Sequence, residues 1–286
     1  MDDQTTSTRE LFTKLRNKVL ITYQDPEASA ITSLILEKVT GLSRNDLIIK
    51  QEVIFTEVQQ DQLRDILSRL QAHEPVQYIL EEAWFYSRKY LVNPHVLIPR
   101  METEELVSLV IKENQFDHPK ILEIGSGSGC IIISLALELE NSKCTATDLF
   151  KDTLNISSQN AKILEASVNF IKHDILSDPP LNQKFDILIS NPPYVRNSEK
   201  TLMARNVLDY EPHTALFVDD HDPLIYYRKI FEHIPAIMNS GGKIYLEINE
   251  SLNEEIVVLM KKYQLVNCRI IMDINQKARI AVAQVA

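Results

Sequence analysis

Three glycines fall within the five residues 125–129 of the segment Leu122-Glu123-Ile124-Gly125-Ser126-Gly127-Ser128-Gly129. They directly follow the expected strand at 120–124. The whole chain of 286 residues contains six glycines, where average usage would give roughly 20. Glycines between a strand and a helix let the backbone turn tightly and let a ligand approach without a Cβ in the way. The cluster therefore predicts a loop that binds a nucleotide-like ligand.

The spacing of these glycines is G-x-G-x-G, because Cys130 and Ile132 stand where the dinucleotide fingerprint would need its last glycine. A pyrophosphate prefers a helix N-terminus aimed at it, whereas a nucleoside without phosphates needs a turn that its sugar and tail can lie across. Asp148 ends the next expected strand and could accept hydrogen bonds from both ribose hydroxyls, and Glu123 could face an ammonium group. These features favour S-adenosylmethionine over NAD; another nucleotide, or a turn that serves only packing, is the alternative.

A second segment with chemical potential, Asn191-Pro192-Pro193-Tyr194, follows the apolar run Phe185–Ser190. Proline restricts the residue before it to extended geometry, so Asn191 and Pro192 are both held extended. The Asn191 side-chain oxygen and the Pro192 carbonyl can then accept both hydrogens of a planar –NH₂ group, on which Tyr194 can stack. Such acceptors would hold a poorly nucleophilic nitrogen in line with an incoming methyl group. The segment predicts N-methylation, with a structural turn as the alternative.

The elements that must position these two segments alternate between strand and helix from Arg100 onward. Strands are expected at 120–124, 143–148, 168–172, 185–190, 243–248, 266–272 and 278–284, with helices near 102–113, 128–140, 151–165, 222–238 and 251–262. Alternation of this kind indicates a mainly parallel, doubly wound α/β sheet, and the last two strands suit an antiparallel pair at one edge. Gly241-Gly242 is expected to mark the turn into the strand at 243–248.

The first part of the chain is expected to form a small helical bundle. Helix starts are indicated at Ser7, at Asp25-Pro26 and at Thr56, each followed by apolar residues at helical period, and Gly41 suits a helix end. The prolines and short β-like runs that follow are typical of a hairpin or extended connector. We therefore predict a helical domain, a hairpin connector and an α/β domain over residues 1–74, 75–99 and 100–286.

Several segments resemble the N5-glutamine methyltransferases that modify peptide chain release factors. The resemblance runs from about Glu74 to Glu250 and includes PVQYIL (75–80), LIPRMETEELV (97–107), LEIGSGSGCIIISLA (122–136), FDILISNPPYV (185–195), YEPHTAL (210–216) and GGKIYLEI (241–248). It implies a Rossmann-like, seven-stranded methyltransferase domain preceded by a small helical domain and a hairpin. The chain departs from the family pattern at Glu81, where a glycine is usual, at Met101, where a proline is usual, and at Ile175, where an aromatic residue can stack on adenine.

The resemblance also implies an activity and a set of site residues. The expected reaction is methylation of the glutamine side-chain nitrogen (N5) in the Gly-Gly-Gln motif of a release factor. S-adenosyl-L-methionine would be the cofactor and S-adenosyl-L-homocysteine the product, without a metal. The expected cofactor-binding residues are Glu123, Gly125, Ser126, Gly127, Ser128, Gly129, Asp148, Ile175 and Asn191. The substrate would be held by Asn191, Pro192, Pro193 and Tyr194, with Asn191, Pro192 and Tyr194 catalytic, and the helical domain would dock it.

Composition narrows the class of partner and compartment. The formal net charge is −10, so stable nucleic-acid binding through phosphates is not expected. No apolar run approaches the length that spans a bilayer, the polar N-terminus is unlike a targeting peptide, and the three cysteines show no CxxC pair. We therefore expect a cytoplasmic enzyme whose partner is a release factor, without membrane association.

Three other functions compete with this hypothesis. A glutamine on a ribosomal protein presents the same chemistry as one on a release factor. Adenine-N6 methylation of nucleic acid is a second alternative, because the exocyclic amine of adenine is also a planar –NH₂ group whose hydrogens Asn191 and Pro192 could accept. A non-catalytic binding module that retains the fold is the third.

Overall fold

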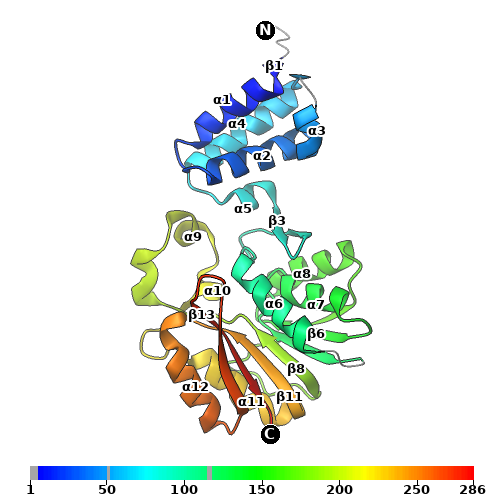
Figure 1. Ribbon diagram of the computed structural model, residues 1–286, viewed down its shortest axis with the longest axis vertical. Coiled ribbons are helices and arrows are strands. Elements are labelled where there is room, and N and C mark those ends of the chain that lie inside the picture. The colour runs from blue at the N-terminus through cyan, green and yellow to red at the C-terminus, as the bar shows by residue number, and fades with distance from the viewer. Residues whose placement is uncertain (1–5, 50–51, 115–117) are drawn as a thin grey trace. The chain divides into compact units, whose positions relative to one another are not determined.

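The computed structural model describes residues 6–49, 52–114 and 118–286, and Figure 1 shows its helices and strands. The chain forms two compact units. The helical unit contains the described residues of Met1–Glu81 together with Ala204–Tyr210, and the sheet unit contains Glu82–Met203 and Glu211–Ala286. The domain boundaries at residues 74 and 99 remain predictions.

The helical unit is built from helices, as predicted, and α1 to α5 share one apolar core. The elements are α1 (Thr8–Val19), α2 (Glu27–Thr40), α3 (Arg44–Ile49), α4 (Glu57–Gln71), α5 (Val76–Leu80) and α9 (Arg205–Tyr210), with a short antiparallel pair β1 (Thr6–Ser7) and β2 (Glu52–Val53). Their buried side chains include Leu15, Ile31, Ile35, Ile66 and Leu70. Helix α9 belongs here although it is distant in sequence, and the Tyr210 hydroxyl donates to the Ala72 carbonyl at 2.8 Å.

Local sequence signals explain most of the helix ends in this unit. The Ser7 hydroxyl caps α1 by accepting from the Glu10 N–H at 3.2 Å, Thr56 and Gln59 form a capping box at α4, and Gly41 ends α2 with φ +69°. The dipeptide Asp25-Pro26 also precedes a helix, α2, but the Asp25 side chain does not cap it, as its type would suggest: the cap residue is Pro26, and the Asp25 carboxylate binds Arg16 and Ser29.

The expected connector contains a short helix followed by the predicted hairpin. Within the predicted connector, PVQYIL forms helix α5 (Val76–Leu80) with Pro75 as its N-cap residue, and the helix ends at Glu81 in the left-handed region, φ +58°. This conformation explains why a glycine suits that position. The hairpin itself is confirmed: β3 (Glu82–Phe85) pairs antiparallel with β4 (Arg88–Leu91) through a two-residue turn with positive φ at Tyr86 and Ser87.

The sheet unit contains the predicted seven-stranded sheet, in the order β12-β13-β11-β8-β5-β6-β7. Its strands are β5 (Lys120–Ile124), β6 (Lys143–Asp148), β7 (Val168–Lys172), β8 (Phe185–Ser190), β11 (Met238–Glu247), β12 (Val266–Met272) and β13 (Ala278–Gln284). Strand β13 runs antiparallel to both neighbours, and the other pairings are parallel. The mostly parallel sheet with an antiparallel edge is therefore confirmed, and Figure 1 shows it between two layers of helices.

Alternating side chains of the central strands enter two separate cores. Ile187 and Ile189 of β8 are buried in one cluster, with α6 (Met101–Glu113), α7 (Cys130–Glu138) and α8 (Lys151–Ile163). Leu188, between them, is buried in the other cluster, with α11 (Ile225–Ile237) and α12 (Asn253–Lys262). This period of two explains why the strand reads as a continuous apolar run, since both of its faces are covered.

Two regions of the chain differ from the prediction. Residues 195–218 form β9 (Val195–Arg196), the 3₁₀ helix η1 (Asn197–Leu202), α10 (His213–Leu216) and β10 (Phe217–Val218), with α9 between η1 and α10. The expectation that Gly241-Gly242 precedes the strand is wrong: both lie inside β11, at a shift in its register with β8 between Met238 and Lys243.

Candidate active site

A cavity of about 490 Å³ lies within the sheet unit, a volume typical of small-molecule sites. It lies at the carboxyl ends of β5, β6 and β8, which is where ligands bind in open α/β sheets. The lining comes from residues 95–100, 123–128, 147–150, 173–176 and 190–193, and from the segments around α10 and η1. The glycine turn and the Asn-Pro-Pro segment, distant in sequence, therefore share one cavity.

The glycine turn closes the carboxyl end of β5. The N–H groups of Gly125 and Ser126 both donate to the Thr147 carbonyl at 2.9 Å, which ties the turn to β6. Gly125 and Gly127 line the cavity with φ values of +81° and +52°, and a Cβ at either would meet no atom within 4 Å. The positive φ favours glycine at these two positions, and the space above them is open to a ligand.

Gly129 has a different role from the other two glycines. It is the N-cap residue of α7, has φ +80° and is not among the residues that line the cavity. A Cβ there would lie 2.9 Å from Ile133 Cδ1 and 3.0 Å from Ser157 Cβ. Gly129 therefore allows the start of α7 to pack against α8.

Two buried hydroxyl groups in the turn fit a polar ligand. Ser126 and Ser128 are 3% and 2% exposed, and both line the cavity. Within the part of the chain that the structure describes, their Oγ atoms make no hydrogen bond. Because buried polar groups are nearly always satisfied, these hydroxyls are suited to bind polar atoms of a cofactor.

Two carboxylates lie beside the turn. Asp148 accepts from the Gly127 N–H at 3.1 Å and from the Phe150 N–H at 3.2 Å, and Glu123 accepts from the Ile132 N–H at 3.2 Å. Burial raises the pKa of both groups, and the neighbouring Asp148 charge raises that of Glu123 further. Two desolvated carboxylates that disfavour each other's charge would both be stabilised by a cationic ligand. The predicted cofactor carries positive charge on sulfur and nitrogen, so the residues fit it.

The Asn-Pro-Pro segment forms another wall of the cavity. Asn191, Pro192 and Pro193 line it, whereas Tyr194 does not. The Asn191 Nδ2 donates to Thr103 Oγ1 at 3.3 Å. The Tyr194 hydroxyl donates to Glu247 Oε1 at 2.8 Å, and burial raises the pKa of this tyrosine. Stacking of Tyr194 on the substrate remains a prediction.

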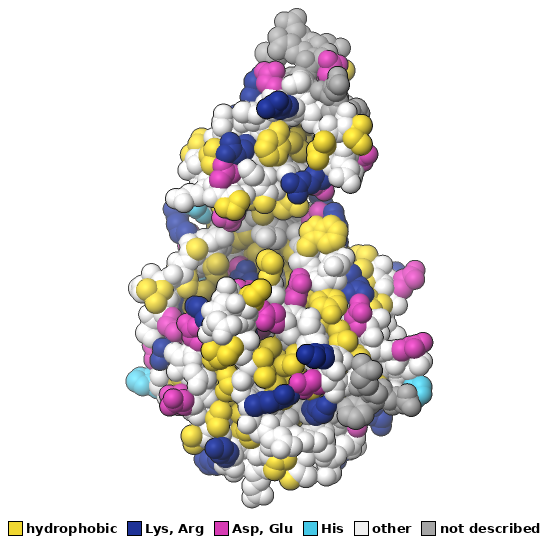
Figure 2. Space-filling model, in the orientation of Figure 1, with side chains coloured by type: hydrophobic (Ala, Val, Ile, Leu, Met, Phe, Trp, Pro, Cys, Tyr) yellow, Lys and Arg dark blue, Asp and Glu magenta, His cyan; other side chains and the backbone are white. Residues whose placement is uncertain are grey.

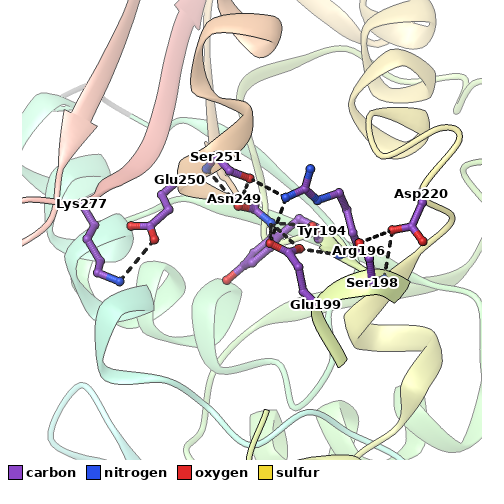
Figure 3. Close-up of polar contacts among 9 residues, drawn as sticks. All are labelled: Tyr194, Arg196, Ser198, Glu199, Asp220, Asn249, Glu250, Ser251 and Lys277. Atoms are coloured by element: carbon purple, nitrogen blue, oxygen red, sulfur yellow. Dashed lines mark hydrogen bonds and ion pairs between the residues drawn. The ribbon is translucent and has the colours of Figure 1, made fainter. Parts of the chain in front are cut away.

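The backbone beyond Tyr194 is held by a polar cluster, which Figure 3 shows in close-up. The Asn249 side-chain nitrogen donates to the Tyr194 carbonyl at 3.2 Å and to Glu199 Oε2 at 3.0 Å. The Glu199 carboxylate also accepts from the Arg196 N–H at 2.8 Å. Asn249 follows β11, so the end of this strand fixes the path of the chain as it leaves the cavity.

An ion pair between a half-buried arginine and a buried glutamate lies beside the cavity. Arg100 Nη2 lies 2.6 Å from Glu211 Oε1, and the other Glu211 oxygen accepts from the Ile98 N–H at 3.2 Å. The Glu211 side chain is 1% exposed, so its charge is compensated almost entirely by these two partners. The pair joins the segment before α6 to the segment before α10, both of which line the cavity.

Sequence reasoning missed the residues that support Asn191. Thr103 and Glu247 form a 2.7 Å hydrogen bond, and Asn249 continues the same strand end. One signal was present: Glu247 is a carboxylate inside the apolar run KIYLEI, and an unexplained charge in a central strand indicates a buried polar contact. Ile175, in contrast, lines the cavity as expected for a cofactor contact.

Two further properties concern metals and membranes. In residues 6–49, 52–114 and 118–286, no group of three or more His, Cys, Asp or Glu side chains could hold a metal ion. Across these same ranges, no helix combines the length and apolar character needed to cross a membrane.

Comparisons with known proteins agree with this geometry. A model of the PrmC N-terminal domain matches residues 17–80, and one of the methyltransferase small domain matches residues 102–213. The release factor glutamine methyltransferase of Flavobacterium psychrophilum is 43% identical over 90% of this chain and 92% of its own length. The enzyme of the same name from Bacteroides thetaiotaomicron is 41% identical over 94% and 97%. A methyltransferase structure from Pyrococcus furiosus, 17% identical, superposes with a TM-score of 0.52 over 80% of this chain and 98% of that chain, which supports the fold.

Proposed function

The chain belongs to the release factor glutamine methyltransferase family, and from that premise we propose that it methylates the glutamine of a release factor. The methyl group would pass from S-adenosyl-L-methionine to the side-chain nitrogen N5 in the Gly-Gly-Gln motif. The observation that carries the proposal is that the Gly125–Ser128 turn and Asn191-Pro192-Pro193 line the same cavity. A methyl donor and an amide acceptor can therefore meet in one site.

The cofactor would lie against the glycine turn and its two carboxylates. Asp148 suits the ribose hydroxyls, Glu123 suits a cationic group, and Ile175 suits an apolar contact with adenine. The remaining proposed contacts are the turn residues Gly125, Ser126, Gly127, Ser128 and Gly129, of which Gly129 would act by shaping the turn, and Asn191. When bound, the cofactor supplies a methyl group on positively charged sulfur and leaves as neutral S-adenosyl-L-homocysteine.

The Asn-Pro-Pro-Tyr segment would hold the glutamine amide. The Asn191 Oδ1 and the Pro192 carbonyl accept the two amide hydrogens, which fixes the nitrogen and aims its lone pair at the methyl carbon. Neither acceptor needs to remove a proton, because the extra proton can leave the nitrogen for water after the transfer. The gain is positioning and electrostatic stabilisation as positive charge develops on the nitrogen.

The remaining parts of the proposal concern partners and compartment. The helical unit would dock the release factor, and the enzyme would act in the cytoplasm without a metal. Stable nucleic-acid binding is not part of the proposal, given the net charge of −10. On the face drawn in Figure 2, the basic side chains are interspersed with acidic ones among the described residues.

Incubation with methyl-labelled cofactor tests the proposal against its alternatives. A release factor, a ribosomal protein and adenine-containing DNA are offered separately, and the label is expected on the release-factor glutamine. Label found only in DNA or only in the ribosomal protein would refute the choice of substrate. The variant N191A should lose at least ~100-fold in kcat, whereas the control N155A, on the exposed side of α8, should keep full activity. Full activity of N191A would refute the mechanism.

A further inference from the structure

Glu247 is a fully buried carboxylate at the end of a central strand. It is 1% exposed and belongs to β11, where Leu246 pairs in parallel with Ser190 of β8. Glu247 follows Leu246 as Asn191 follows Ser190, so the two residues come at the same level of two neighbouring parallel strands. A charge in this position costs free energy unless its oxygens are well satisfied. Its hydrogen bonds must account for its presence.

The two oxygens of Glu247 are used by two different side chains of the site. Thr103 donates from Oγ1 to Oε2 at 2.7 Å, and Tyr194 donates from its hydroxyl to Oε1 at 2.8 Å. Burial raises the pKa of Glu247, while these two donors and the nearby Arg279 guanidinium favour its charged form. In both contacts the hydroxyl is the donor and the carboxylate oxygen is the acceptor, so both hydroxyl protons point toward Glu247.

This arrangement imposes a direction on Asn191. Because the one Thr103 hydroxyl proton is used by Glu247, Thr103 Oγ1 can only accept from its other neighbour. That neighbour is the Asn191 amide, whose Nδ2 lies 3.3 Å away. Rotation of the amide by 180° would place Oδ1 against an oxygen with no proton to offer, so this orientation is disfavoured.

We infer that Glu247 is a positioning residue that acts through the Thr103 hydroxyl to set the orientation of the Asn191 amide, so that Oδ1 faces the substrate nitrogen. The inference rests on the proposed function for its kinetic consequence, because only an acceptor can bind the hydrogens of a glutamine –NH₂ group. Its structural part, a single orientation of Asn191, does not depend on which substrate is methylated.

Steady-state kinetics provide the first test. In E247Q the new amide can donate to Thr103, which frees the threonine proton to point at Asn191, and T103V removes the hydroxyl with little change in shape. Both variants should lose roughly 10- to 100-fold in kcat, while the dissociation constant for S-adenosylmethionine, measured by calorimetry, stays within about threefold of the wild-type value. T103S keeps the hydroxyl and should recover most of the lost rate. E254Q, on α12, is the matched control and should match the wild type.

A double-mutant comparison separates this role from simple support of the fold. The variant that combines E247Q with T103V should be no slower than the slower single variant, because both changes act on the same amide. Multiplying losses would instead show two independent effects and would overturn the inference. Wild-type kcat in both E247Q and T103V would overturn it as well.

Side-chain NMR provides a readout that is independent of activity. In protein labelled with ¹⁵N-asparagine, the Asn191 –NH₂ signals are identified by their loss in N191D. They should form one sharp pair in the wild type and should double or broaden in E247Q as the second orientation becomes populated. An unchanged pair in both E247Q and T103V would refute the orientation. A wild-type enzyme that shows this sharp pair but does not methylate release factor would refute the proposed function and leave the positioning role supported.

Discussion

Replacing Gly129 by alanine should destabilise the sheet unit more than the same change at Gly127, although both glycines have positive φ. The backbone cost is shared, because alanine in the left-handed region costs about 1–2 kcal/mol. At Gly127 a Cβ would meet nothing within 4 Å. At Gly129 it would lie 2.9 Å from Ile133 Cδ1, 3.0 Å from Ser157 Cβ and 3.4 Å from Ser157 Cα. The isoleucine end can rotate, but the backbone of α8 must shift, and such overpacking costs about 1–3 kcal/mol.

The expected difference between the two variants is therefore about 2 kcal/mol, or roughly 4–8 °C in Tm. Thermal unfolding followed by circular dichroism and by fluorescence measures it, and Trp84, the one tryptophan of the chain, reports on the sheet unit. G41A is the matched control, because Gly41 has φ +69° and no close neighbour but belongs to the helical unit. If G129A unfolds at the same temperature as G127A or above it, the packing role of Gly129 is refuted.

Affinity for the cofactor should follow the opposite order. Gly127 lines the cavity and Gly129 does not, so a methyl group at 127 occupies space that the cofactor needs. We expect G127A to weaken S-adenosylmethionine binding by about tenfold, about 1.4 kcal/mol, while G129A changes it less at temperatures where that variant is folded. Calorimetric titration gives both constants. Equal losses in the two variants would contradict the distinction between a glycine that faces ligand and one that faces a helix.

Three further predictions concern charges and thiols. R100A should destabilise the sheet unit by about 2 kcal/mol because it leaves the Glu211 carboxylate, 1% exposed, without its ion pair, and adding E211Q should restore part of the Tm. Burial raises the pKa of Glu123 well above 4.5, so the wild type loses stability as pH rises above that value and the buried carboxyl is forced toward its charged form. The Tm of E123Q, measured relative to that of the wild type, should therefore increase between about pH 5 and 8. A Tm difference that stays constant over this range would contradict the prediction. Burial raises the pKa of Cys130 to about 12, so alkylation at about pH 8, followed by mass spectrometry, should modify the less buried Cys268 first.

The sheet and the two motifs could be predicted from sequence because each depends on local pattern. The strand at 185–190 is apolar on both faces and ends in Asn-Pro-Pro, and the structure begins and ends β8 at those same residues. The segment at 76–80 could not be assigned in the same way, since four apolar residues and one glutamine fit a strand and one turn of helix equally well. Only packing in the helical unit decides it.

The residues that support the site were hidden for a different reason. The hydrogen bond between Thr103 and Glu247 joins positions 144 residues apart, and no periodicity relates them. The region 195–218 has the same difficulty, because its short elements are held by distant side chains, as Asn249 holds Glu199. Motifs reveal residues that meet a ligand, whereas the residues that orient them are found only when the strands are placed side by side.

The membership of α9 in the helical unit affects how the protein can be made and dissected. The chain enters the helical unit a second time at Ala204 and leaves it at Tyr210, so this unit is assembled from two separate stretches. During synthesis it cannot be completed until residue 210 has left the ribosome, by which time β8 and the Asn191 segment have already emerged. A truncation that starts at Glu82 would remove the helices but leave α9 behind without its packing partners. Dissection of the two units therefore requires replacing residues 204–210 as well as cutting at residue 81.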